Sequence, residues 1–141
     1  MKTANPYLNF NGNTEEAFNF YKSVFGGEFL SVVRFKDTPE GNKLPGGDAE
    51  KIMHIALPLG SNTLMATDAI ESAGHKLREG NNFYISLEAE SEDEGKLLCD
   101  KLSEGGKASV PFSKQFWGAW HGNFTDKFGI HWMVNYTPAQ P

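Results

Sequence analysis

The last third of the chain gathers the residue types best suited to chemistry. Trp120-His121 and His131-Trp132 stand on either side of Asp126-Lys127-Phe128-Gly129, a four-residue turn signal. An Asp at the first position and a Gly at the last favour a β-turn. Imidazoles bind protons and metals, and aromatic rings line pockets for small molecules. The pattern indicates a strand–turn–strand segment beside a small-molecule site.

Alternation after Gly129 predicts a strand whose two faces differ. One face carries Ile130, Trp132, Val134 and Tyr136, and the other carries His131, Met133 and Asn135. The apolar face suits packing against helices, and the mixed face suits a cavity. The alternative interpretation is that these Trp and His residues are ordinary core and edge residues of a sheet.

Two histidines are the candidates for acid–base chemistry, because imidazole is the side chain that titrates nearest neutral pH. His54 lies in Met53-His54-Ile55-Ala56-Leu57, where alternation places Met53, Ile55 and Leu57 toward a helix and His54 toward the cavity. His131 shares the face of Met133. The single cysteine, Cys99, lies in a helical pattern and is expected to be a structural thiol rather than a nucleophile.

Composition bounds the class of protein. The chain has 141 residues, of which 39% are hydrophobic and 13% aromatic, which is typical of one globular domain. Its net charge of −5 and the lack of a basic stripe disfavour nucleic-acid binding. The N-terminus has no signal-peptide pattern, and no apolar run reaches membrane-spanning length. We expect a soluble, cytoplasmic protein with no membrane partner.

Local signals in the first half predict strand, helix, strand, long loop and hairpin. Asn13, with Glu16 three residues on, predicts the start of a helix over 14–25, and Gly26-Gly27 predicts its end. Strands are expected over 7–10, 29–35, 52–59 and 63–67. The Pro- and Gly-rich segment 37–50 is expected to be a loop, and loops of this length are often functional.

The second half repeats this order. A strand is expected over 82–89, then a helix capped by Ser91 with Glu94, then a strand that begins near Ala108. The two caps are 78 positions apart (13 to 91), and the glycine pairs are 79 apart (26 to 105). A nearly constant offset indicates an internal duplication.

Several segments carry a specific family resemblance. They are Leu8-Asn9-Phe10-Asn11-Gly12-Asn13, Phe25-Gly26-Gly27, Leu64-Met65-Ala66-Thr67-Asp68, and the run from Phe116-Trp117-Gly118 to Trp132-Met133. The chain resembles the vicinal oxygen chelate superfamily of glyoxalases, bleomycin-resistance proteins and dioxygenases, and within it the PhnB-like branch. The resemblance implies an α+β fold. It also implies a single domain over 1–141 that consists of two tandem βαβββ modules (3–70 and 80–137). It implies a curled mixed sheet around a cavity, with the helices outside.

The resemblance also assigns positions for metal ligands. By local motif these positions fall on Asn5, Met65, Tyr84 and Met133. Amide, thioether and phenol groups are poor ligands for hard or borderline divalent ions. We expect no metal at these positions and no cofactor. The alternative is a relocated metal site built from His54 and His131, with Asp68 or His121.

Polar residues on the inward faces form the expected ligand-binding set. The apolar residues Leu8, Ala66, Leu87 and Val134 fall on the opposite faces, as helix-backed strands require. The set comprises Tyr7, Asn9, His54, Met65, Thr67, Tyr84, Ser86, Trp117, His121, His131 and Met133.

Three functions remain open at this point. The first is metal-independent binding of a small polar or aromatic metabolite. The second is a metal-dependent lyase, isomerase or dioxygenase with the relocated site at His54 and His131. The third is sequestration of a cationic planar drug, which acidic charge and aromatic walls would suit. A homodimer is also expected, because an uncharged edge strand and the exposed aromatic segment Trp117–Trp120 would gain from a partner.

Overall fold

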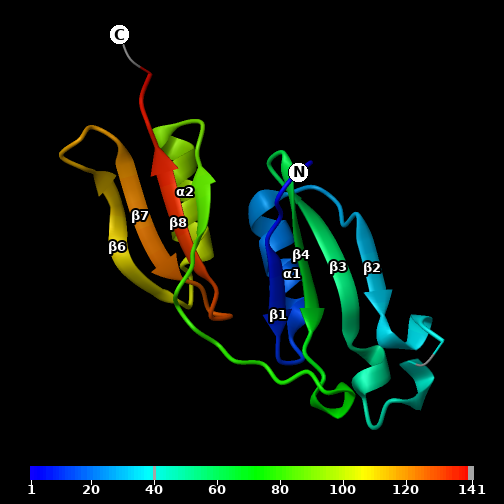
Figure 1. Ribbon diagram of the computed structural model, residues 1–141. Helices are drawn as coiled ribbons and strands as arrows, with labels where there is room; N and C mark the ends of the chain where they lie inside the picture. Colours follow the sequence, from blue (N-terminus) through cyan, green and yellow to red (C-terminus); the bar gives the residue numbers. More distant parts are fainter. Residues whose placement is uncertain (40, 140–141) are drawn as a thin grey trace. The chain divides into compact units, whose positions relative to one another are not determined.

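The computed structural model describes residues 1–39 and 41–139, which divide into two compact units, Met1–Arg78 and Glu79–Pro141. We call them the first unit and the second unit. Each unit holds one α-helix and one open, four-stranded mixed sheet (Figure 1). The α+β fold and the two-module organisation expected from the sequence are therefore confirmed.

The first unit orders its strands β1-β4-β3-β2. β1 pairs with β4 in parallel, and the other neighbours are antiparallel. Short 3-10 turns occupy the long loop, at Phe35–Asp37, Gly41–Lys43 and Asp48–Glu50, and a fourth lies at Glu71–Ala73. The regular elements are β1 (Tyr7–Phe10), α1 (Thr14–Phe25), β2 (Ser31–Arg34), β3 (Ile52–Leu59) and β4 (Asn62–Asp68).

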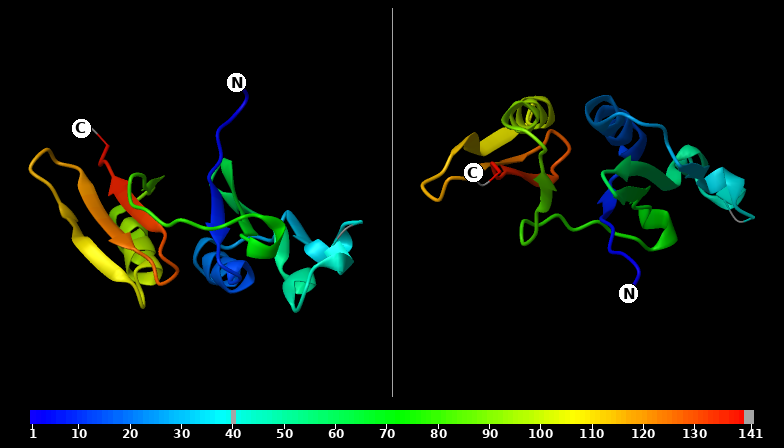
Figure 2. Two further views of the ribbon diagram at one scale, coloured as in Figure 1. Left: turned by 60° about the horizontal axis from the view of Figure 1, so that its bottom comes forward. Right: turned by 90° about the horizontal axis from the view of Figure 1, so that it is seen from above.

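The second unit repeats the same strand order, β5-β8-β7-β6, with the same parallel pair at one edge. Its elements are β5 (Ile85–Glu88), α2 (Glu92–Leu102), β6 (Lys107–Lys114), β7 (Trp120–Thr125) and β8 (His131–Tyr136). In both units the helix lies against one face of its own sheet (Figure 2). Identical topology in the two halves is what an internal duplication produces.

The core of each unit lies between its helix and its sheet. On the first sheet, the buried apolar residues lie on β1, β3 and β4 and include Leu8, Phe10, Ile55, Leu57, Leu64 and Ala66. In the second unit, Trp132 and Val134 are buried and Met133 between them is only half-buried. The alternation expected after Gly129 is thus confirmed. Removing these apolar side chains from water is the main stabilising term.

Three local predictions need correction. The second strand begins at Ser31, not Phe29, and the fifth begins at Ile85, not Asn82. In β3, Ile52 rather than Met53 is buried beside Ile55 and Leu57. The reason is a register shift against β2, where Val33 pairs with His54 but Arg34 pairs with Ile52. A bulge of this kind interrupts strict alternation.

The two helices begin differently from one another. Ser91 caps α2 as expected, since its hydroxyl oxygen accepts a hydrogen bond from the Glu94 backbone N–H at 3.0 Å. Asn13 makes no side-chain cap at α1, so that prediction is wrong. Asp68 takes its place, as one carboxylate oxygen accepts from the backbone N–H and the hydroxyl of Thr14.

No helix in the described part of the chain is long and apolar enough to cross a membrane.

Candidate functional site

The face of the first sheet that points away from α1 carries a Tyr–His pair. The hydroxyl of Tyr7 lies 3.1 Å from Nδ1 of His54, and the two rings are 5.7 Å apart. Met65 lies on β4 between them, paired with Tyr7 on one side and with Ala56 on the other. We call this surface the open face of the first unit.

Asn9 and Thr67 continue the open face, since they pair directly across β1 and β4. Both are half-buried. The sequence placed Tyr7, Asn9, His54, Met65 and Thr67 in one ligand-binding set, and the sheet brings these five onto one surface.

His54 keeps one ring nitrogen available. Its Nδ1 contacts Tyr7, and burial raises the pKa of the Tyr7 hydroxyl, which therefore stays neutral. A neutral hydroxyl either donates to Nδ1 or accepts from it, so both neutral tautomers of His54 are possible. Among the described residues, Nε2 has no hydrogen-bond partner. His54 is therefore free to donate a hydrogen bond to a ligand or to accept one.

On the corresponding face of the second unit, the polar side chains are hydrogen-bonded to one another. Asn135 donates from Nδ2 to Ser86 and uses its amide oxygen toward Nδ1 of His121 at 2.7 Å. Nε2 of His121 lies 3.1 Å from the amide nitrogen of Asn123. Because an amide oxygen only accepts and an amide nitrogen only donates, His121 is neutral with its proton on Nδ1.

His131 is also bonded at both ring nitrogens. Nε2 lies 2.9 Å from the Gly80 carbonyl, so it carries a proton, and Nδ1 lies 2.8 Å from the Thr125 hydroxyl. The ring of Tyr84 packs 5.4 Å from the His131 ring. These contacts hold the segment before β5 against β8. His131 thus supports the fold more directly than it offers a group to a ligand.

The positions assigned to metal ligands fall in separate units, with Asn5 and Met65 in the first and Tyr84 and Met133 in the second. The side-chain oxygen of Asn5 accepts a hydrogen bond from the Thr63 backbone and so fastens the N-terminal segment to the β3–β4 hairpin. Within residues 1–39 and 41–139, no three His, Cys, Asp or Glu side chains form a group that could hold a metal ion.

Trp117 lies in the turn between β6 and β7 rather than on a strand. It is 59% exposed, and its neighbour Phe116 is 97% exposed, with the two rings in edge contact. Trp120 is half-buried because its ring stacks on Phe112. Burial raises the pKa of the Cys99 thiol to about 12, with a smaller contribution from Asp100, so this thiol stays protonated.

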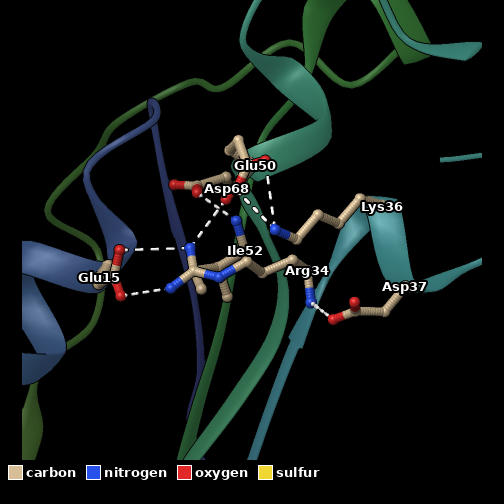
Figure 3. A network of polar contacts seen from close by, with 7 residues as sticks. All are labelled: Glu15, Arg34, Lys36, Asp37, Glu50, Ile52 and Asp68. Atoms are coloured by element: carbon tan, nitrogen blue, oxygen red, sulfur yellow. Dashed lines mark hydrogen bonds and ion pairs between the residues drawn. The ribbon is translucent and has the colours of Figure 1, made fainter. Parts of the chain in front are cut away.

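One site was missed by the sequence analysis. A cavity of about 450 Å³ lies in the first unit where the long loop meets the start of α1. Its charged lining comes from Glu15, Arg34, Glu50, Lys51 and Asp68. Figure 3 shows the guanidinium of Arg34 held between Glu15 of α1 and the Glu50 backbone, with Lys36 reaching the Glu50 carboxylate. The only sequence signals were the length of the 37–50 loop and the carboxylate of Asp68.

A family match over most of the chain defines the class of protein. Residues 4–134 match the Glyoxalase/Bleomycin resistance protein/Dioxygenase superfamily, and the chain belongs to it. This confirms the resemblance noted in the sequence.

Particular relatives match over nearly their full length. Protein YjdN of Escherichia coli (strain K12) is 30% identical over an alignment of 144 positions, which covers 96% of this chain and 96% of that protein. Protein PA1353 of Pseudomonas aeruginosa is 38% identical, with a TM-score of 0.85 over 97% of this chain and 98% of that one. A PhnB protein of Bacillus cereus is 25% identical, with a TM-score of 0.77 over 96% of this chain and 100% of that one.

Proposed function

We propose that this chain binds a small organic molecule on the open face of its first unit, with His54 as the central contact. The observation that carries the proposal is the difference between the strand histidines. His121 and His131 use both ring nitrogens on protein groups, whereas His54 presents Nε2 with no partner among the described residues. An unpaired polar atom on a half-buried side chain beside an aromatic ring suits a bound ligand.

The chemistry of the open face favours a ligand with both polar and flat apolar parts. Tyr7, His54, Asn9 and Thr67 supply hydrogen-bonding groups, and Met65 supplies a polarizable apolar surface between them. The ordinary partners for such groups are hydroxyl, carbonyl or carboxylate oxygens on a small metabolite.

We propose that binding requires no metal at the positions that relatives use. Amide and thioether side chains stand at Asn5, Met65 and Met133, and the phenol of Tyr84 stands at the fourth position. The Asn5 amide oxygen is already used by the Thr63 backbone. These groups offer a divalent ion neither imidazole nor carboxylate.

A thermal-shift screen of metabolites on chelator-treated protein tests the proposal. We expect at least one compound to raise the melting temperature equally with and without added divalent metal, because ligands that bind only the folded state stabilise it. His54→Gln should abolish the shift. The matched control His75→Gln, which removes an exposed histidine after the Glu71–Ala73 turn of the first unit, should leave it unchanged.

Other outcomes of the screen would favour a different function for the chain. A stoichiometric metal required for binding, lost in His54→Gln and in His131→Gln, would favour the relocated metal site. A screen in which only cationic planar drugs bind would favour sequestration. Unchanged binding in His54→Gln would overturn the proposal.

We also propose a homodimer. Phe116 and Trp117 expose aromatic surface at the β6–β7 turn, and β1 is an edge strand of its sheet. Light scattering should report about twice the chain mass of 15.6 kDa. A species of single-chain mass at micromolar concentration would contradict this proposal.

A further inference from the structure

We propose that the cavity between the long loop and the start of α1 binds a small zwitterion that carries a carboxylate and an ammonium group, such as a free amino acid. This site is separate from the open face. Asp68 alternates with Thr67 along β4, so it lies on the side of the sheet that faces α1, where Ala66 and Leu64 are buried. The cavity volume of about 450 Å³ falls in the range of small-molecule pockets.

Three of the charged groups, Arg34, Glu15 and Asp68, are already bonded to other groups of the protein. The guanidinium of Arg34 donates to both carboxylate oxygens of Glu15, at 3.3 and 2.5 Å, and to the Glu50 carbonyl at 2.8 Å (Figure 3). Asp68, 2% exposed, accepts from Thr14 and from the Ile52 backbone N–H at 2.8 Å. These groups form fixed walls of the cavity.

Lys51 is the cation left available. Its ammonium group donates to the Gly12 carbonyl at 3.1 Å, and no carboxylate lies within ion-pair distance of it in the described ranges. An ammonium group has three protons, so two remain for a ligand. Gly12 leaves room for this group, since a Cβ there would lie 3.1 Å from Nζ of Lys51. The matching ligand group is a carboxylate.

Glu50 supplies the opposite charge. Its side chain is 66% exposed, and its two carboxylate oxygens share one donor, the ammonium of Lys36, at 3.0 and 3.2 Å. Two carboxylate oxygens accept about four hydrogen bonds, so capacity remains. A cavity with a free cation and an undersaturated carboxylate favours a ligand with both charges over one with a single charge.

Amide chemical shifts in a ¹H–¹⁵N NMR titration test the proposal on the intact chain. The probes are L-alanine and its single-charge analogues propionate, which lacks the ammonium, and ethylamine, which lacks the carboxylate. We expect L-alanine, or another amino acid from a panel of glycine, L-glutamine and L-lysine, to shift the amides of Gly12, Gly47 and Lys51. Each single-charge analogue should bind at least about tenfold more weakly.

Variants identify the two binding groups. Lys51→Met keeps the apolar stem and should weaken binding of the amino acid about tenfold or more, and Glu50→Gln should weaken it by a smaller factor. Lys107→Met, which removes an exposed lysine from β6 of the second unit, is the matched control and should bind normally. The analogue comparison needs no variant, so it holds even where a substitution disturbs folding. Absence of shifts with all four amino acids, or equal binding of propionate and L-alanine, would overturn the proposal.

Discussion

The two units share one topology but secure their helices by different means. In the second unit, Ser91 caps α2 through a neighbour three residues away. In the first, Asp68 reaches α1 from the end of β4 and also accepts from the Ile52 backbone at the start of β3. One carboxylate thus joins a helix and two strands. A nearly constant sequence offset does not guarantee that the same interactions are kept in both halves.

The open faces differ in the same way. In the second unit, the polar side chains of this face hydrogen-bond to one another in a network of Ser86, Asn135, His121 and Asn123. In the first unit, Nε2 of His54 has no hydrogen-bond partner among the residues that the structure describes. A saturated network stabilises a sheet, whereas an unsaturated one retains binding capacity. We therefore expect the polar face of the second unit to contribute to stability, and we propose that the open face of the first unit binds the ligand.

The largest expected effect comes from Asp68→Ala. The substitution leaves three donors without their acceptor, the backbone N–H groups of Thr14 and Ile52 and the Thr14 hydroxyl, in a buried setting. We expect the free energy of unfolding to fall by about 3–5 kcal/mol. Urea unfolding followed by circular dichroism measures it. A loss of under about 1 kcal/mol would show that Asp68 does not join these elements.

Elements set by local patterns could be predicted from the sequence, and long-range contacts could not. The bounds of α1 follow from a helical stripe that ends at Gly26, whose positive φ ends the helix. The cap on α1 was missed because Asp68 lies 54 positions from Thr14. No window of neighbouring residues contains such a pair.

The candidate site shows the same division. Strand alternation correctly placed Tyr7 and His54 on one face, since side-chain direction follows from strand geometry. Alternation could not show that His121 and His131 are hydrogen-bonded at both ring nitrogens, because their partners depend on how neighbouring strands pair. The cavity lined by Arg34 and Lys51 was missed because a loop and a helix start, distant in the sequence, form it together.

The next effect compares histidines between the two faces. His121→Ala removes both hydrogen bonds of a half-buried ring, and we expect a loss of about 1–2 kcal/mol in unfolding free energy. His54→Ala removes one bond on a more open surface, with an expected loss of about 0.5 kcal/mol. Chemical denaturation of both variants measures the difference. The reverse order would contradict the contrast between a stabilising face and a recognition face.

A smaller effect compares the two helix caps. Ser91→Ala removes the bond to the Glu94 N–H and should cost about 1 kcal/mol. Asn13→Ala should cost much less, because Asn13 makes no cap bond and Asp68 serves α1 instead. Melting curves of the two variants, recorded side by side, provide the test. Equal losses would mean that Asn13 caps α1 in solution.

The smallest effect concerns Glu15 and pH. A hydrogen bond from Arg34 lowers the pKa of the Glu15 carboxyl, and the positive charge of Arg34 adds to this against a partial opposing effect of burial. A carboxylate whose pKa is lower in the folded state than in the unfolded state stabilises the fold at pH values above its unfolded-state pKa. This stabilisation is lost as the pH falls through the folded-state pKa. Because Glu15 is 53% exposed, solvent screening limits the contribution to about 0.5 kcal/mol.

Glu15→Gln should therefore be less stable than the natural chain near neutral pH and equally stable in acid, as measured by urea unfolding across that range. High salt should also reduce the difference in unfolding free energy between Glu15→Gln and the natural chain. Glu92→Gln is the matched control, because it removes an exposed carboxylate from the first turn of α2 that makes no ion pair in the described part of the chain. It corrects for the effect of the helix dipole on a first-turn carboxylate. If Glu15→Gln and Glu92→Gln lost the same unfolding free energy near neutral pH, the ion pair with Arg34 would contribute nothing to stability. The first turns of α1 and α2 would then not differ in this respect.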